Sequence, residues 1–325
     1  MKTVLVTAIG SFAADIVIKN LKKQKYKVIG CDIYNKEWVA DAYNVDEFFQ
    51  VPKVSEEVAY LKFILDICQT KSVDFIFPLT DIDVDFYNKH REEFEDKGVC
   101  LCISEKKAID ICRNKKVLNQ YLQENNVCRV IPTYTVNDLN IEALEYPVVA
   151  KPYNGRSSQG LSYIDTKEQM QNFLSRTDVI DYIIQPKIEG VILTVDVVRD
   201  ANSGQIICIA RRELLRTLNG AGTSVYVFED QELEMQCAKI ADLLNVKGCV
   251  NFEFIETNAK EKYFLECNPR FSGGVEFSCL TGYDCIANHI RCFSGEKIEK
   301  RDAIRNQYIA RKYEEYVTKV EGVDK

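Results

Sequence analysis

Two hydrophobic periods alternate along the first hundred residues of the chain. Short apolar runs, which are typical of buried strands, are separated by stretches in which apolar residues recur at helical spacing. The predicted strands are residues 4–6, 28–31, 75–78 and 99–103. The predicted helices are residues 13–22, 58–68 and 84–94. Strands that alternate with helices in this way predict a doubly wound parallel sheet of the α/β class.

Beyond this region the pattern becomes that of an α+β fold. The predicted helices are residues 114–124, 167–174 and 232–244, with one more after Gly282. The predicted strands are residues 147–152, 182–185, 193–199 and 205–212, followed by an antiparallel hairpin of residues 250–254 and 263–268. The last 25 residues predict a terminal strand or helix on the surface. A length of 325 residues agrees with two or three compact units.

The second strand of the hairpin carries the most informative chemistry in the chain. Side chains alternate along a strand, so Glu266 and Asn268 point to one face and offer neighbouring oxygen ligands of the kind that Mg²⁺ prefers. Arg270, two residues further on, can reach an anionic oxygen held on that metal. We interpret this pattern as a site for a metal-bound polyphosphate, and the alternative is an edge hairpin with a polar end.

The first strand of the hairpin also supports a site for a metal-bound polyphosphate. It contains Asn251 and Glu253, which could share a face with the polar residues of its partner strand. The sequence leaves the register open, because a slip of one residue would send one set of side chains to the opposite face.

Two further segments have the character of nucleotide-binding elements. Lys151 precedes a small, polar loop at residues 152–160, which can aim backbone N–H groups at phosphate oxygens. This loop lacks the Gly-Lys-Ser/Thr of a Walker A motif, and a plain hairpin connection is the alternative. The strand that ends at Gln185 breaks into a short hinge before Gly190, and such a hinge can offer backbone groups to an adenine edge.

Composition and charge exclude several classes of protein. The net charge of −7 gives no global basic field for nucleic acid, and no apolar run approaches the length of a membrane span. The 13 cysteines are scattered without a Cys-x-x-Cys pair, which argues for reduced, buried thiols in a cytoplasmic protein. With only two histidines, a zinc site or a histidine-based triad is not expected.

The turn after the first strand bears a partial likeness to a dinucleotide fingerprint. Of the three fingerprint glycines only Gly10 is present, although Asp32 follows at the distance of a ribose-binding acid. We favour a Rossmann-like domain that does not carry NAD over an NAD-linked oxidoreductase.

In their order along the chain, these segments resemble the ATP-grasp superfamily, and in particular its carbamoyl-phosphate-synthase-like, single-module branch with amino-acid ligases such as the pyrrolysine-pathway ligase. The resemblance covers nearly the whole chain. It implies a Rossmann-like pre-ATP-grasp domain at residues 1–105, ATP-grasp subdomain A at 106–180, and subdomain B with a C-terminal tail at 181–325. ATP would lie between the two subdomains.

The resemblance also implies roles for individual residues. The expected phosphate contacts are Lys115, Lys151, Ser157 and Ser158. The expected adenine contacts are Gln185, Lys187 and Ile188. The expected metal and nucleotide ligands on the hairpin are Glu266, Asn268 and Asn251, for Mg²⁺ or Mn²⁺ with ATP. Arg270 and Lys151 are the expected catalytic residues. Arg212 and Arg216 are candidates for holding a substrate carboxylate or phosphate, with solvated strand-end arginines as the alternative.

Two departures from the family pattern concern the nucleotide. Residues 191–193 are apolar where the family usually has a ribose-binding glutamate, which leaves Glu189 as the candidate replacement. Pro186 stands at a hinge position that is frequently acidic, and proline has no N–H to donate.

The function implied by the resemblance is an ADP-forming, ATP-dependent carboxylate–amine ligase that activates a small carboxylate, with an amino acid as the expected type, as an acyl phosphate. The alternatives are an ATP-dependent carboxylase or phosphotransferase and a non-catalytic nucleotide-binding subunit. The expected partners are small-molecule carboxylate and amine substrates, with neither nucleic acid nor membrane. The oligomeric state stays open, a homodimer being the commonest assembly.

Overall fold

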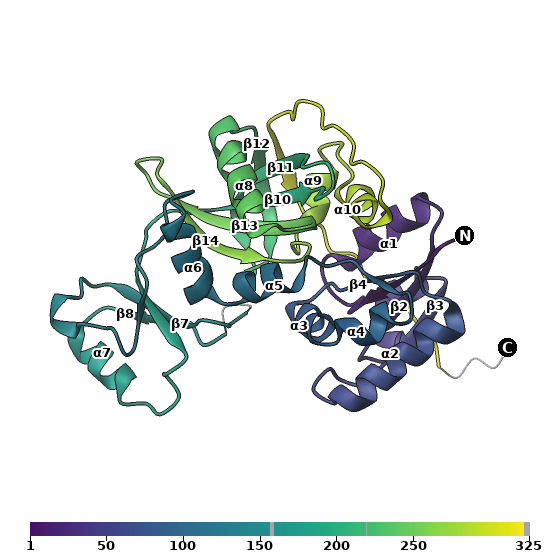
Figure 1. Cartoon of the computed structure of the whole chain (residues 1–325), viewed down its shortest axis with the longest axis horizontal. Helices are drawn as coiled ribbons and strands as arrows, with labels where there is room; N and C mark the ends of the chain where they lie inside the picture. Colours follow the sequence, from purple (N-terminus) through teal and green to yellow (C-terminus); the bar gives the residue numbers. More distant parts are fainter. Residues whose placement is uncertain (157–158, 219, 322–325) are drawn as a thin grey trace.

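The computed structural model describes residues 1–156, 159–218 and 220–321. Its strands form three sheets (Figure 1): a five-stranded sheet near the N-terminus, a six-stranded sheet in the centre, and a four-stranded sheet that projects to one side. This arrangement confirms the predicted combination of an α/β domain with α+β subdomains. Within the described part of the chain, no helix has the length and apolar character needed to cross a membrane.

The N-terminal domain is built on a parallel sheet with the strand order β3-β2-β1-β4-β5. Its strands are β1 (Thr3–Thr7), β2 (Lys27–Asp32), β3 (Glu47–Gln50), β4 (Phe75–Phe77) and β5 (Cys100–Leu101). Its helices are α1 (Ala14–Lys23), α2 (Glu57–Lys71), α3 (Asp81–Lys89) and α4 (Arg91–Glu95), with 3-10 turns at Lys36–Trp38 and Ala40–Tyr43. Helix α1 packs on one face of the sheet and helices α2 and α3 pack on the other, as expected for a doubly wound fold.

The four-stranded antiparallel sheet has the order β6-β9-β7-β8. Its strands are β6 (Tyr134–Thr135), β7 (Val148–Pro152), β8 (Ser162–Ile164) and β9 (Tyr182–Pro186). A short 3-10 turn (Ile141–Ala143) and helix α7 (Lys167–Leu174) complete this part of the chain. Met170 and Phe173 of α7 are buried against the sheet, so the small subdomain has a hydrophobic cluster of its own.

The six-stranded antiparallel sheet has the order β14-β13-β10-β11-β12-β15. Its strands are β10 (Val191–Arg199), β11 (Ile206–Arg216), β12 (Gly222–Phe228), β13 (Gly248–Glu256), β14 (Lys262–Asn268) and β15 (Gln307–Ala310). Helices α5 (Lys106–Arg113), α6 (Lys115–Glu124) and α8 (Gln231–Leu244) share one hydrophobic cluster with this sheet. Helices α9 (Val275–Cys279) and α10 (Cys285–Ser294) lie in the cluster shared with the N-terminal domain.

A buried histidine connects the N-terminal domain to the central sheet. The Nδ1 atom of His289 on α10 accepts a hydrogen bond from the amide of Cys249 (2.8 Å), and Nε2 donates to the carbonyl of Cys102 (3.1 Å). Burial lowers the pKa of His289 to about 3, so the ring is neutral at physiological pH. Gly248 lies against this ring with φ +78, and a Cβ there would come within 2.6 Å of Nδ1.

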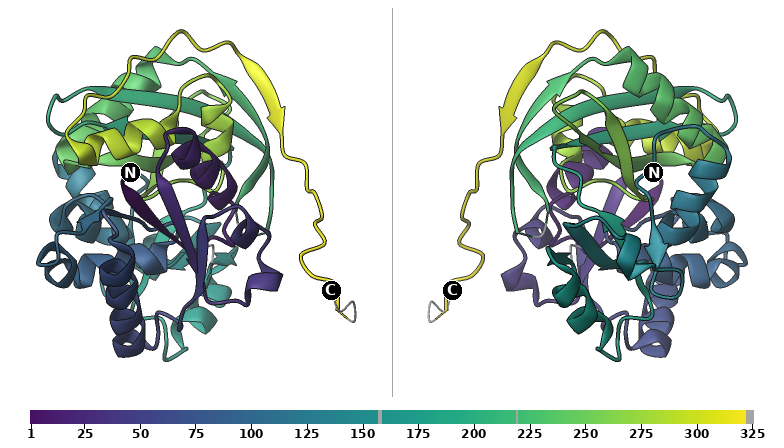
Figure 2. Two further views of the ribbon diagram at one scale, coloured as in Figure 1. Left: turned by 90° about the vertical axis from the view of Figure 1, so that its right-hand side faces the viewer. Right: turned by 90° about the vertical axis from the view of Figure 1, so that its left-hand side faces the viewer.

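The chain after β15 runs as an extended strap down one side of the molecule (Figure 2). Arg311 begins the strap and donates to the carbonyl of Gly273 at 2.9 Å. Near its end, the hydroxyl of Thr318 donates to the carbonyl of Glu37 in the N-terminal domain (2.6 Å). The predicted surface element at the C-terminus is therefore one short strand followed by this strap.

Candidate active site

A cavity of about 750 Å³ lies where the three sheets meet. One wall comes from strands β7 and β9 of the small subdomain, and the opposite wall comes from the central sheet. Residues 11–13 and 79–82 of the N-terminal domain line one end. The cavity size fits a small-molecule ligand.

The hairpin register places four polar side chains together on the cavity wall. Asn251 of β13 is paired with Asn268 of β14, and Glu253 is paired with Glu266. The amide of Asn268 donates to Asn251 Oδ1 (3.1 Å) and to Glu266 Oε1 (3.2 Å). The register that the sequence left open thus brings both sets of residues to the same face.

The two facing glutamates differ in their electrostatic environment. Burial raises the pKa of Glu253, and the negative charge of Glu266 raises it further. Burial also acts on Glu266, but Lys115 and Lys151 outweigh it and hold the pKa of Glu266 below its usual range. The charges of Arg216, whose Nη2 lies 3.2 Å from Glu253 Oε2, and of Arg270 lower the pKa of Glu253 by less than burial and Glu266 raise it.

This donor set fits a divalent cation. Two carboxylates and the amide of Asn268 supply hard oxygen ligands, and a cation would relieve the repulsion that raises the pKa of Glu253. Among the described residues, no group of three His, Cys, Asp or Glu side chains is placed to hold a metal, so the pair of glutamates needs the asparagine or ligand oxygens to complete a coordination shell. The sequence analysis named Glu253 as a possible neighbour of these residues but did not assign it as a metal ligand, because the strand register was open.

Two lysines approach the same carboxylate from the other side of the cavity. Lys115 Nζ lies 3.3 Å from Glu266 Oε2 and donates to the carbonyl of Gly155 at 2.7 Å. Lys115 is the first residue of α6, where the side chain of Asn114 caps the helix. Lys151, on β7, also lines the cavity, and its pKa is lowered to about 8 by burial and by the neighbouring charge of Lys115. The structure therefore brings both predicted lysines together.

The loop after β7 is only partly described. Ser157 and Ser158, which the sequence interpretation assigned to phosphate binding, lie outside the described residues. Gly155, Arg156 and Gln159 flank them and line the cavity. The carbonyl of Gly155 in this loop contacts Lys115, and the phosphate-binding role of the loop stays a prediction.

Arg270 is held by groups from two domains. Its Nη1 donates to the carbonyl of Phe271 at 2.9 Å, and its Nη2 donates to Asp81 Oδ2 at 2.9 Å. A longer contact of 3.4 Å joins Nη2 to Asn268 Oδ1. Asp81 is the first residue of α3 in the N-terminal domain.

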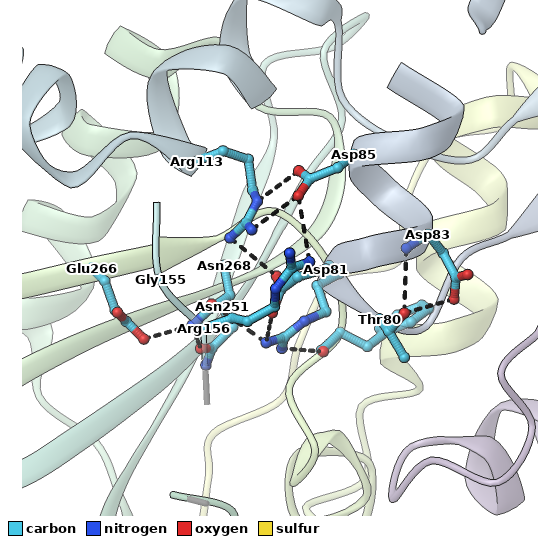
Figure 3. Close-up of polar contacts among 12 residues, drawn as sticks. Thr80, Asp81, Asp83, Asp85, Arg113, Gly155, Arg156, Asn251, Glu266 and Asn268 are labelled. Carbon is cyan, nitrogen blue, oxygen red and sulfur yellow. Dashed lines mark hydrogen bonds and ion pairs between the residues drawn. The ribbon is translucent and has the colours of Figure 1, made fainter. Parts of the chain in front are cut away.

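The next turn of α3 makes a second ionic contact with the site (Figure 3). Asp85 accepts two hydrogen bonds from Arg113, at 2.7 Å and 3.0 Å, and lies 3.7 Å from Arg156 of the small subdomain. Arg113 also lies 3.5 Å from Asp81. The sequence interpretation treated this stretch only as a helix, although acidic residues at 81, 83 and 85 beside a capping threonine were visible.

The other end of the cavity is mainly apolar. The hinge residues Gln185, Lys187 and Ile188 line it, together with Val149, Leu161, Ile192, Ile255 and Leu265. The amide of Lys187 donates to the carbonyl of Pro147 at 3.1 Å. The side chain of Gln185 donates to Thr133 at 2.8 Å. Glu189, the candidate for ribose binding, is instead 78% exposed and pairs with Lys187 at 2.6 Å.

Of the two arginines predicted to hold substrate, only Arg216 lines the cavity, where its Nε donates to the carbonyl of Gly220 at 2.8 Å. Arg212 lies on the opposite face of β11 and pairs with Glu256 at 2.6 Å. Neighbouring side chains alternate along a strand, so Arg211 takes the cavity-facing position instead. The placement of Arg212 therefore differs from the expectation.

Arg211 is the centre of a buried ion cluster. It bonds to Asp196 on β10 and to Glu213 at 3.1 Å, and its Nη2 donates to the hydroxyl of Ser272 at 2.9 Å. Ser272 belongs to the turn that follows Arg270. The cluster thus fixes that turn to the central sheet.

Asp32, at the end of β2, stabilises the backbone of the turn after β1. Asp32 Oδ2 accepts the amide of Gly10 at 2.8 Å, and Oδ1 accepts the amide of Tyr34 at 3.2 Å. Asp32 therefore occupies a backbone amide that a dinucleotide fingerprint would offer to its ligand. This supports the preference for a domain without NAD.

Comparison with known proteins agrees with this architecture. Residues 178–316 match the family model described as ATP-grasp in the biosynthetic pathway with Ter operon, and residues 4–102 match the PylC-like N-terminal domain. These matches show an ATP-grasp family segment at residues 178–316 behind a PylC-like N-terminal domain. The resemblance inferred from the order of the motifs is thereby confirmed. No curated protein matches the sequence.

Solved structures show the same ATP-grasp fold. Biotin carboxylase from Campylobacter jejuni, in a complex with β-γ-ATP, has a TM-score of 0.78 and 17% identity over 94% of this chain and 74% of that one. The biotin carboxylase domain of Hydrogenobacter thermophilus 2-oxoglutarate carboxylase, with MgADP, ADP and bicarbonate, has a TM-score of 0.77 and 19% identity over 94% and 73%. L-amino acid ligase from Bacillus licheniformis has a TM-score of 0.71 and 15% identity over 88% and 72%.

Proposed function

We propose that this ATP-grasp protein is an ADP-forming carboxylate–amine ligase. The observation that carries the proposal is the convergence of Lys115, Lys151, Arg270 and the facing pair Glu253 and Glu266 on one 750 Å³ cavity. Cationic groups beside paired carboxylates are what phosphoryl transfer from a metal-bound nucleotide requires, because the protein mainly positions the phosphates and neutralises their charge.

The nucleotide would lie along the length of the cavity. Its adenine fits the apolar end at the hinge, where the carbonyl of Lys187 and the backbone of Ile188 are the candidate edge contacts, since the amide of Lys187 already donates to Pro147. Its phosphates would then reach Lys115 and Lys151. The Nδ2 of Asn251 is buried without a hydrogen-bond partner among the described residues, which suits a phosphate oxygen.

Glu253, Glu266 and Asn268 would hold Mg²⁺, or Mn²⁺ in its place. When bound, the cation supplies charge neutralisation for the phosphate oxygens of ATP. The relative in complex with MgADP supports this assignment by analogy of fold.

The reaction would proceed in two steps. An oxygen of the substrate carboxylate attacks the γ-phosphorus of ATP, the bond to the bridging oxygen breaks, and ADP leaves with that oxygen. The amine nitrogen then attacks the acyl carbon, phosphate departs with its oxygen, and the nitrogen loses a proton to give an amide. Arg270 and Lys151 would stabilise the transferring group, and Arg216 is the candidate for holding the carboxylate substrate.

The test is phosphate release from Mg-ATP across a panel of amino-acid pairs and small carboxylates, with mass spectrometry of the products. The proposal expects ADP, phosphate and a new amide in equal amounts. Turnover that depends on bicarbonate and yields a carboxylated product would establish the carboxylase alternative. Nucleotide binding without turnover of any panel member would instead favour a non-catalytic subunit.

A further inference from the structure

We propose that Asp81, in the N-terminal domain, is a positioning residue that orients Arg270 for phosphoryl transfer. The proposal rests on the function proposed above and extends it to a residue outside the ATP-grasp subdomains. Asp81 and Arg270 are 189 residues apart in the chain, and their side chains meet at 2.9 Å at the end of the cavity that the N-terminal domain lines.

The start of α3 fixes where the carboxylate of Asp81 lies. The hydroxyl of Thr80 accepts the amide of Asp83 at 3.3 Å and donates to the Asp83 carboxylate at 2.7 Å, so the first turn is capped (Figure 3). Because this cap sets the helix start, Asp81 is held at the edge of the cavity. Its side chain is only 6% exposed.

The contacts of Arg270 show why this carboxylate decides its orientation. One edge of the guanidinium donates to the backbone carbonyl of the adjacent residue, Phe271. The other edge has one charged partner, Asp81, and one long contact to Asn268. An arginine that is already fixed in place loses little side-chain freedom when it meets its ligand, which is the benefit of a preorganised site.

Asp81 stays ionised in this buried position. Burial acts to raise its pKa, but Arg270 and Arg113 outweigh burial and lower the pKa of Asp81 below its usual value. Its Oδ1 is 3.5 Å from Arg113, so the same carboxylate also stands beside the ion pair between Arg113 and Asp85. The orientation of Arg270 therefore depends on how the N-terminal domain packs against the central sheet.

The test compares Asp81→Ala and Asp81→Asn with the unaltered protein. Loss of the carboxylate is expected to lower kcat for ATP turnover about 10- to 100-fold, while KM for ATP changes less than about threefold. Asp81→Asn keeps the shape and an acceptor oxygen, so a smaller loss is expected. Should the alanine variant fail to fold, the asparagine variant is judged by the same criteria. Unchanged kcat in a folded variant overturns the proposal.

A double-mutant cycle separates positioning from structural support. If Asp81 acts through Arg270, Asp81→Ala has no further effect on kcat in an Arg270→Ala background. An equal loss in both backgrounds overturns the proposal. Asp85→Ala is the matched variant on the same helix: it removes a carboxylate that contacts Arg113 and Arg156 rather than Arg270, and it should raise KM for ATP more than it lowers kcat.

A readout without turnover distinguishes failure of this inference from failure of the proposed function. An arginine-selective dicarbonyl reagent, followed by peptide mass analysis, measures how accessible and mobile the guanidinium of Arg270 is. We expect faster modification of Arg270 in Asp81→Ala than in the unaltered protein. Unaltered protein that turns over no ATP contradicts the proposed ligase, whereas unchanged reactivity of Arg270 contradicts the positioning role.

Discussion

At the scale of single residues, the site brings charged groups of both signs together in a partly buried position. Glu266 is flanked by Lys115 and faces Glu253, and each of these charges would be costly to bury alone. Their convergence on one cavity suits a ligand that has anionic oxygens and carries a cation. The alternation of Glu266 and Asn268 along β14 therefore predicted correctly that they share a face. The position of Glu253 opposite Glu266 follows from the pairing of β13 with β14.

Removal of either central charged group should abolish most activity. Glu266→Ala and Arg270→Ala are each expected to lower ATP turnover by roughly 10²–10³-fold, because each group stabilises charge at the phosphates. Phosphate release at saturating ATP measures the loss, and circular dichroism checks that the fold is kept. Normal turnover in either folded variant would show that the site assignment is wrong.

Metal affinity should depend on pH through Glu253. Its pKa is raised by burial and by Glu266, so a proton competes with the cation at a higher pH than for an ordinary glutamate. The Mg²⁺ concentration that gives half-maximal phosphate release should therefore rise as pH falls from about 8 to about 5. In Glu253→Gln the affinity should be weaker and less dependent on pH. A wild-type Mg²⁺ requirement that is flat over this range would contradict the assignment.

At the scale of elements, the register of β13 and β14 determines which polar side chains share the cavity wall. The start of α3 determines where Asp81 meets Arg270. The predicted strands and helices are present, with bounds shifted by a few residues, and the predicted helix at 84–94 is divided into α3 and α4. The sequence interpretation missed β3, α5, β6, β8, β12 and α9. Strand β12 begins at Gly222, in a glycine-rich segment whose sequence is typical of a loop. This segment forms a strand because pairing with β11 supplies its backbone hydrogen bonds.

The Arg211 cluster gives a prediction at this scale. Arg211→Met leaves Asp196 and Glu213 buried without their cation, which should lower the free energy of unfolding by about 3–5 kcal/mol. Urea denaturation measures the change. The triple variant Arg211→Met, Asp196→Asn, Glu213→Gln removes all three charges and should recover part of the loss. A single variant as stable as the parent would mean that the cluster does not hold the turn.

At the scale of the whole molecule, the candidate active site lies at an interface among three sheets. The small subdomain supplies Lys151, the central sheet supplies Glu266 and Arg270, and the N-terminal domain supplies Asp81. Stability of the domain interface is therefore a condition for the site geometry. His289, which joins Cys102 to Cys249, is one of the groups that maintain it.

His289 predicts how stability depends on pH. Its pKa is about 3 in the folded protein and about 6.5 in an unfolded chain, so the unfolded state binds more protons between these values. Stability is fully present above about pH 6.5 and falls as pH decreases toward 3, by up to about 1.4 kcal/mol per pH unit from this group. His289→Gln should be less stable at neutral pH but lose less on acidification. The midpoints of urea unfolding, measured for both proteins across this pH range, test the prediction. If the midpoints of the two proteins fall equally with pH, His289 is not the group that causes the loss of stability.

The sequence by itself determined the fold class, the order of the ATP-grasp segments, and the residues whose chemistry depends on local spacing. Alternation along one strand is enough to place Glu266 beside Asn268 and to bring Arg270 within reach. Only the tertiary structure decided that Arg211 rather than Arg212 faces the cavity, that Glu253 opposes Glu266, and that Asp81 holds Arg270. The physical reason is that periodicity encodes which face a side chain takes within its own element, whereas strand register and domain docking depend on packing between segments that lie far apart in the chain.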